Sequence, residues 1–139
     1  QIKKGNLNVG RKLIISDYTE IRSYGSITIG DNFFLNKFSR IIAHENISIG
    51  KNVTIAQFVS ILDHDHNYVF QNDEMNLDGY LTSRIIIGNN VWISDKVSVL
   101  KGVEIGDNVI IGANSVVNND IPSNSIAAGC PCKVVRKLN

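Results

Sequence analysis

Three histidines are the side chains of this sequence best suited to proton transfer. His64 and His66 stand two residues apart in the string ILDHDHNY, and His44 lies alone twenty residues earlier. In an extended chain alternate side chains share a face, so we expect His64 and His66 on one face and Asp63 and Asp65 on the other. Histidine titrates near neutral pH, with an ordinary pKa of about 6.5, and this suits it to act as a general base.

A six-residue repeat must position these histidines, because it runs through most of the chain. A helix cannot gather residues six apart, since six residues turn it by about 600°. One strand could gather them, but it would far exceed the usual length of about 3–10 residues. We therefore predict that the chain bends every six residues and that three short strands make one triangular coil. The inward residues are expected to be two series, Ile87, Ile93, Val99, Ile105, Ile111, Val117 and Val91, Val97, Val103, Val109, Ser115, Ile121.

The first half of the chain follows the same rule with longer coils. Gly10, Gly30 and Gly50 are twenty residues apart, which equals three sixes and a two-residue corner insertion. Small or turn-forming residues also follow the inward positions, and we expect them at corners that need a positive φ or tight packing. These residues are Gly88, Ser94, Gly106, Gly112 and Asn118.

Two segments interrupt the repeat of this single domain, residues 1–139. Residues 67–84 contain no six-residue period, and we expect an insertion that projects from one edge and contributes to function. From about residue 123 to residue 139 the sequence departs again and ends in KVVRKLN. We expect a cap or a short terminal helix that packs on the last coil.

With these features the sequence resembles the hexapeptide-repeat acyltransferases, and most closely their galactoside and maltose acetyltransferase branch with its relatives that modify surface-polysaccharide sugars. The strings IGDNFFLN (29–36), IGNNVWIS (87–94) and NDIPSNSIAAGCPCKVVRK (119–137) carry the resemblance. It implies an all-β fold, a left-handed parallel β-helix. The handedness comes from the family alone, because crossovers between parallel strands are ordinarily right-handed. The resemblance also implies a homotrimer with active sites between neighbouring chains, and acetyl-CoA as co-substrate without a permanently bound cofactor.

The same resemblance assigns catalytic roles. His64 falls where related enzymes place their catalytic histidine, so we expect it to be the general base, with His66 as the alternative. A backbone N–H near Ser94 is expected to stabilise the oxyanion. Asn36 matches a position that lines the catalytic site, although it could belong to an asparagine ladder at a corner. Trp92 matches a residue beside the catalytic histidine, although it could equally be an outward contact between subunits.

The resemblance also indicates the residues that bind the acceptor sugar, which we expect to be Phe34, His44 and His66. His44 stands where galactoside enzymes carry an aspartate, and Phe34 stands where they can carry a tyrosine. We also expect the N-terminal helical region that lines the acceptor site of those enzymes to be missing or replaced here. We therefore expect a nucleotide-linked or lipid-linked sugar rather than a free β-galactoside.

CoA is expected to lie along a groove that includes Ser94, Ala113 and Asn118. Lys133 and Arg136, in the basic C-terminal segment, match positions that meet the nucleotide phosphates, which cations bind well. The alternative for these two cations is a solvated basic C-terminus.

Composition limits the partners and the compartment. A net charge of +1 gives no reason to expect nucleic acid binding, and no apolar run is long enough to span a bilayer. The N-terminal string QIKKGNLNVG lacks the apolar core of a signal peptide. Cys130 and Cys132 are closer than a typical zinc-binding pair, and no other thiol accompanies them. We expect a cytoplasmic protein without a metal.

The function expected from these observations is an acetyl-CoA-dependent O-acetyltransferase that acts on a sugar hydroxyl in surface-polysaccharide biosynthesis. Acetylation of the amine of an amino-sugar nucleotide remains an alternative, because it needs the same base and donor. A non-catalytic β-helix scaffold is a further alternative. A carbonic-anhydrase-like site needs three metal-binding histidines spread across the coils, and His64 and His66 are too close together for that spacing.

Overall fold

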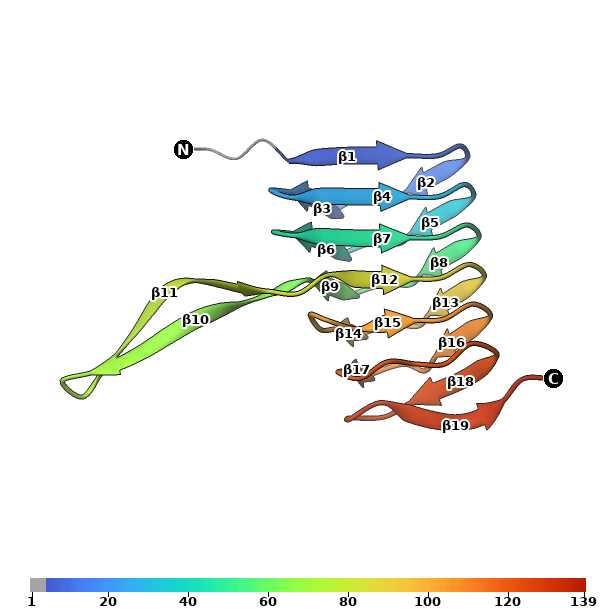
Figure 1. The fold of residues 1–139 in the computed structure, drawn as a ribbon. Coiled ribbons are helices and arrows are strands. Elements are labelled where there is room, and N and C mark those ends of the chain that lie inside the picture. The colour runs from blue at the N-terminus through green and yellow to red at the C-terminus, as the bar shows by residue number, and fades with distance from the viewer. Residues whose placement is uncertain (1–4) are drawn as a thin grey trace.

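The computed structural model describes residues 5–139, and it places no helix among them. Its short strands wind into a triangular prism of about six turns, a left-handed parallel β-helix from which one long hairpin projects (Figure 1). The predicted fold class is confirmed. Residues 5–139 contain no helix long and apolar enough to cross a membrane.

The prism has three faces, each a sheet of parallel strands from successive coils. The first face contains β1 (Asn6–Val9), β4 (Ser26–Ile29), β7 (Asn46–Ile49), β12 (Ile85–Ile87) and β15 (Glu104–Ile105). The second face contains β2 (Leu13–Ile15), β5 (Phe33–Leu35), β8 (Val53–Ile55), β13 (Val91–Ile93), β16 (Val109–Ile111), β18 (Ser125–Ala128) and the antiparallel β19 (Lys133–Lys137). The third face contains β3 (Glu20–Ser23), β6 (Arg40–Ala43), β9 (Ser60–Leu62), β14 (Ser98–Val99) and β17 (Val116–Val117).

Three corners join these faces and run as edges along the prism. The first corner leads from the first face to the second, the second corner leads to the third face, and the third corner leads back to the first. Asparagine side chains stack along the first corner and donate to one another at 2.8 to 3.0 Å. Each of these asparagines has a φ between 55° and 58°, a left-handed conformation that asparagine tolerates. They are Asn32, Asn52, Asn90, Asn108 and Asn124.

Glycine serves a different need at the same corner. Gly30 and Gly50 are not among the residues with positive φ. A Cβ built on Gly30 would lie 2.8 Å from the carbonyl carbon of Gly50, so glycine is required because two backbones approach closely. Small corner residues were expected for two reasons, tight packing and a positive φ. These glycines are needed for the tight packing, and the asparagines adopt the positive φ.

Both predicted aliphatic series lie in one buried column inside the prism, where every member is at most 3% exposed. Ser115 is the single polar member. Its hydroxyl donates to the carbonyl of Gly112 at 2.6 Å and accepts the N–H of Gly129 at 3.0 Å, so its burial leaves no unpaired oxygen. The six-residue period therefore predicted the core correctly.

The interruption of the repeat is an antiparallel hairpin, β10 (His64–Gln71) and β11 (Glu74–Thr82). It leaves the coil directly after Asp63 and returns to Ser83, whose N–H donates to the carbonyl of Asp63 at 2.9 Å. The insertion therefore begins three residues earlier than the predicted range 67–84. Its turn residues, Asn72 and Asp73, have φ of 54° and 60°, as a tight two-residue hairpin turn requires.

The C-terminal segment contains strands and no helix, so of the two expected forms, a cap or a short helix, the structure has the cap. β18 continues the second face, and β19 folds back against it in antiparallel pairing. The segment KVVRK is too short for a stable helix and contains two β-branched valines, which favour a strand. The unpaired edge of β18 supplies the partner that this strand needs.

Candidate active site

All three histidines of the chain gather where the hairpin leaves the third corner. His44 follows β6, and its ring centroid lies 4.1 Å from that of His64. Tyr80 of β11 contacts all three rings, with centroid distances of 4.1 Å to His44, 5.4 Å to His64 and 4.9 Å to His66. Folding has therefore joined two histidines that are two residues apart in the sequence with a third from the preceding coil.

Asp63 holds His44 and His64 of this cluster in position through hydrogen bonds. Its side chain is fully buried, and its two carboxylate oxygens accept the backbone N–H groups of His44, Glu45 and Asn46, each at 2.8 Å. The same carboxylate lies 3.1 Å from Nδ1 of His64. If Nδ1 of the neutral ring donates this hydrogen bond, Nε2 carries the lone pair that a general base needs.

The two aspartates that were expected to share a face are separated. Asp63 lies at the base of the hairpin and faces inward, whereas Asp65 is exposed and forms an ion pair with Lys101 at 2.9 Å. His64 and His66 do lie on one side of the hairpin, since both contact Tyr80. Side chains alternate between the two faces of the hairpin only from His64, the first residue of β10, and Asp63 lies before this strand.

The electrostatic setting of His44 differs from that of a free histidine. Burial lowers the pKa of His44, and the neighbouring His64 lowers it further, while the Asp63 charge acts in the opposite direction. The lowered pKa of His44 favours the neutral form of its ring.

The other predicted site residues lie mainly along a different edge of the prism. Asn36 follows β5, Ser94 follows β13 and Ala113 lies just beyond β16, so all three belong to the second corner. Asn118, which follows β17, belongs to the third corner with the histidines. One chain therefore does not bring His64 together with Asn36 and Ser94.

Two details of the second corner bear on the predicted roles. The Oδ1 atom of Asn36 accepts the N–H of Lys37 at 2.8 Å, and Asn36 takes no part in the asparagine ladder of the first corner. The N–H of Ser94 donates to the carbonyl of Ile111 at 3.0 Å. It is therefore already used within the coil, and an oxyanion donor near Ser94 must be a different N–H of this corner.

The aromatic residues Phe34 and Trp92 lie on the outer surface of the second face, with Thr54 of the intervening strand between them. Trp92 is 51% exposed and Phe34 is half-buried. Lys133 and Arg136 are exposed on β19. Lys133 pairs with Ala128 of β18, and Ala128 in turn packs against Gly112. Lys133 is thus near the end of the second corner that carries Ala113.

Sequence reasoning missed three residues beside the histidines. Tyr24, Glu45 and Tyr80 help to line a cavity of about 610 Å³ next to His44. Tyr80 lay inside the aperiodic segment, where no pattern indicated its direction. Tyr24 precedes His44 by one coil length of twenty residues, and this spacing could have placed the two rings on neighbouring coils.

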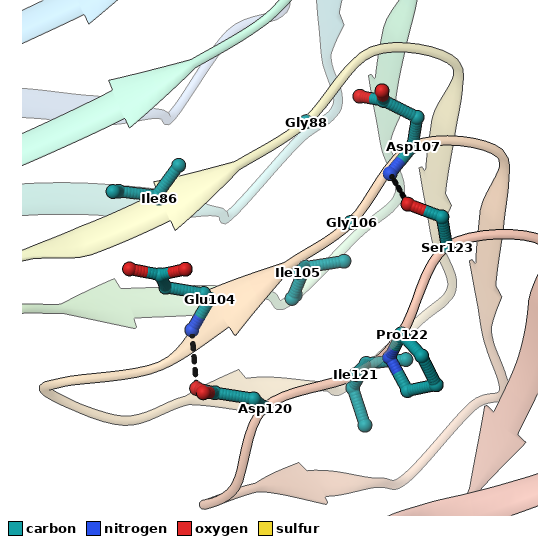
Figure 2. Close-up of a pocket in the computed structure, with 10 residues that line it drawn as sticks. All are labelled: Ile86, Gly88, Glu104, Ile105, Gly106, Asp107, Asp120, Ile121, Pro122 and Ser123. Carbon is teal, nitrogen blue, oxygen red and sulfur yellow. Dashed lines mark hydrogen bonds between the residues drawn. The ribbon is translucent and has the colours of Figure 1, made fainter.

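A second hollow, of about 470 Å³, lies on the first face near the C-terminal coils (Figure 2). Its polar groups hold the coils together: Asp120 accepts the N–H of Glu104 at 2.8 Å, and the N–H of Asp107 donates to Ser123 at 2.8 Å. It contains none of the predicted site residues. Within residues 5–139, no three His, Cys, Asp or Glu side chains are grouped so as to hold a metal ion.

Comparison with known proteins agrees with this architecture. The family model "Bacterial transferase hexapeptide (six repeats)" matches residues 84–119. Galactoside O-acetyltransferase of Escherichia coli (strain K12) is 49% identical over 74 residues, which are 53% of this chain and 34% of that protein. The match thus spans about a third of the length of this curated relative.

Two solved structures extend the likeness over nearly the whole chain. A galactoside acetyltransferase in complex with coenzyme A is 37% identical with a TM-score of 0.81, and the match covers 95% of this chain and 65% of that one. A maltose O-acetyltransferase from Clostridium difficile 630 is 31% identical with a TM-score of 0.65, and the match covers 99% of this chain and 68% of that one. With its repeats, its buried column and this extent of similarity, the chain belongs to the hexapeptide-repeat acetyltransferase family.

Proposed function

We propose that this chain is the catalytic domain of an acetyl-CoA-dependent O-acetyltransferase that acts on a sugar hydroxyl, with His64 as the general base. The observation that carries the proposal is the contact between Nδ1 of His64 and the buried carboxylate of Asp63. A buried carboxylate that orients a partly exposed imidazole is an arrangement suited to proton transfer. A scaffold would have no need of it.

The proposed acetyl transfer uses His64 and Asp63 together. Nε2 of His64 takes the proton of the acceptor hydroxyl as its oxygen attacks the thioester carbonyl of acetyl-CoA. The resulting oxyanion collapses, the acyl–sulfur bond breaks, and protonated His64 returns the proton to the departing CoA sulfur. Asp63, held in place by three backbone N–H groups, stabilises the positive charge that His64 carries between these steps.

We propose that the complete site forms between neighbouring chains of a homotrimer. His64 lies at the third corner, whereas Asn36 and Ser94 lie at the second corner, so a second copy must supply one of the two sets. Exposed aromatic side chains along the second corner support this association. Tyr18 stacks on Phe38 with centroids 5.4 Å apart, and Phe38 stacks on Phe58 at 4.9 Å.

CoA is proposed to lie along the second corner, past Ser94 and Ala113, with its phosphates near Lys133 and Arg136. Asn118 would reach CoA from the neighbouring chain, because it lies at the third corner. The coenzyme A complex of a relative that is 37% identical supports this use of the fold. We place the reaction in surface-polysaccharide biosynthesis on the basis of the shared strings at 29–36, 87–94 and 119–137.

The test is CoA release from acetyl-CoA by the full chain, across acceptors that offer either a sugar hydroxyl or a sugar amine. We expect His64→Ala to lower kcat by about 10² to 10⁴-fold, the usual contribution of a general base. His66→Ala is the matched control, and we expect it to retain most of the kcat.

The opposite ranking of the two variants would assign the base to His66. Turnover of amine acceptors alone would replace O-acetylation by N-acetylation. Failure of the wild-type chain to bind acetyl-CoA in calorimetry would contradict the proposed activity.

A further inference from the structure

The hairpin is attached to the prism at its base, next to the turn that joins β14 to β15 (Figure 1). From residue 68 to residue 82 every hairpin residue is exposed. Within residues 5–139, the ion pair of Asp65 with Lys101 is the single side-chain hydrogen bond or ion pair that joins hairpin residues 65–82 to the prism. The direction of the hairpin therefore depends on a few contacts at its base.

The third corner of the following coil holds both strands of this base. Nζ of Lys101 lies 2.9 Å from Oδ2 of Asp65 on the outgoing strand β10. The N–H of Gly102 donates to the carbonyl of Ser83, directly after the returning strand β11, at 3.0 Å. The N–H of Ser83 donates in turn to the carbonyl of Asp63 at 2.9 Å, so this backbone path leads back to the residue that precedes β10.

The ion pair and the proposed base lie on opposite faces of β10. His64 and Asp65 are consecutive residues of an extended strand, so their side chains point to opposite sides. On one side, the ring centroid of His64 lies 4.1 Å from that of His44 in the preceding coil. On the other side, Asp65 reaches Lys101 in the following coil. The start of β10 is thus supported by the coils before and after it.

We propose that Lys101 is a positioning residue for the proposed acetyl transfer, because its ion pair with Asp65 sets the direction of β10 and keeps His64 against Asp63. The inference rests on the proposed role of His64 and adds the residue that orients this base from the opposite face of its strand. Rotation of β10 about its first residue would carry the imidazole away from the carboxylate. A misplacement of about 1 Å can lower a rate by about 10²-fold.

The exposure of the ion pair limits the size of the effect. The side chains of Lys101 and Asp65 are 32% and 60% exposed, so water weakens their attraction. An exposed pair shifts a local equilibrium by at most about fivefold. Salt weakens it further, since the Debye length falls from about 10 Å at 0.1 M to about 3 Å at 1 M. Lys101 should therefore change kcat by a modest factor that depends on salt.

The experiment measures CoA release from acetyl-CoA by the full chain at low salt and in about 1 M sodium chloride. We expect Lys101→Met to lower kcat about twofold to fivefold at low salt and to approach the wild type at high salt. The KM for acetyl-CoA should stay unchanged, because Ser94 and Ala113 lie at the second corner. Asp65→Asn should match Lys101→Met, and the double variant should lose no more than either single one, since both changes remove one interaction.

Arg84→Met is the matched control. Arg84 follows the hairpin and forms a longer ion pair, 3.7 Å, with Glu104 of the same following coil. This variant should keep the kcat of the wild type. Nitrogen NMR of the His64 ring reports its contact with Asp63 without turnover. In the neutral ring of the wild type we expect one tautomer, with the proton on Nδ1, and in Lys101→Met a mixture of two.

Four outcomes of the kinetic experiment would each overturn the inference. They are an unchanged kcat in Lys101→Met, a loss that persists in full at high salt, additive losses in the double variant, and an equal loss in Arg84→Met. If the wild-type chain turns over no acceptor, the proposed function fails and the NMR comparison decides the role of Lys101 separately. A second tautomer in Lys101→Met alone supports the positioning of His64, whereas identical ring signals in both proteins contradict it.

Discussion

At the residue scale, Asp63 links the two histidines that flank the cavity. One carboxylate accepts the N–H groups at the corner that carries His44, and it also contacts the ring of His64. Removing the carboxylate would leave three backbone N–H groups without their acceptor, so Asp63 supports the corner itself as well as the proposed position of His64. This explains how His64, the proposed base on the first residue of an exposed hairpin, can still hold a defined orientation.

The pKa of His44 predicts a pH dependence of stability. Because its folded pKa is lowered, the unfolded chain takes up a proton below pH 6.5 while folded His44 stays neutral. Stability is therefore fully present above pH 6.5 and falls as the pH drops from there through the lowered pKa. We expect the wild-type chain to lose more stability between about pH 7.5 and about pH 5.5 than His44→Gln does. Urea unfolding at both pH values measures this difference, and equal losses in the two proteins would contradict the expectation.

At the element scale, the hairpin has one apolar and one mainly polar face. Tyr68 lies opposite Leu77, and Phe70 lies opposite Met75. These four side chains are between 59% and 69% exposed. On the other face Val69 lies opposite Asn76. A two-stranded ribbon is at best marginally stable alone, so its apolar face requires a covering surface.

We expect that covering surface to belong to a neighbouring copy of the chain. Phe70→Ser combined with Met75→Ser should therefore weaken association, because it removes apolar area from the contact face. Val69→Ser on the opposite face is the matched control and should leave association unchanged. Light scattering coupled to size-exclusion chromatography, over a dilution series, measures the assembly. An unchanged assembly in the double variant would show that the hairpin is not part of the interface.

At the scale of the whole molecule, the prism holds the proposed functional residues on two separate edges. His64 and His44 lie at the third corner, whereas Asn36, Ser94 and Ala113 lie at the second corner. The parallel ladder and the asparagine stack keep these edges in fixed relation along the coil. If the two sets of residues form one site, as proposed above, they can meet only when a second copy joins the chain in a symmetric assembly.

This division predicts complementation between two inactive variants. His64→Ala disables the third corner, and Asn36→Arg places a bulky cation at the second corner. Neither variant alone should be active. Equal mixtures, refolded or expressed together, should recover roughly a quarter of the wild-type activity, because that fraction of random pairings joins two intact halves. Mixtures as inactive as the separate variants would contradict a site shared between chains.

The sequence alone determined the coil and the content of its core, because the six-residue period is a local pattern in which each inward residue repeats at a constant distance. It also indicated where the repeat stops and which histidines stand there. The tertiary structure decided the rest. The burial of Asp63, the contact of Tyr80 with three histidines and the alignment of Tyr24 with His44 depend on the path of the hairpin and on the stacking of coils. The terminal strand likewise depends on the free edge of β18. These features arise from contacts between segments far apart in the chain, which no local period encodes.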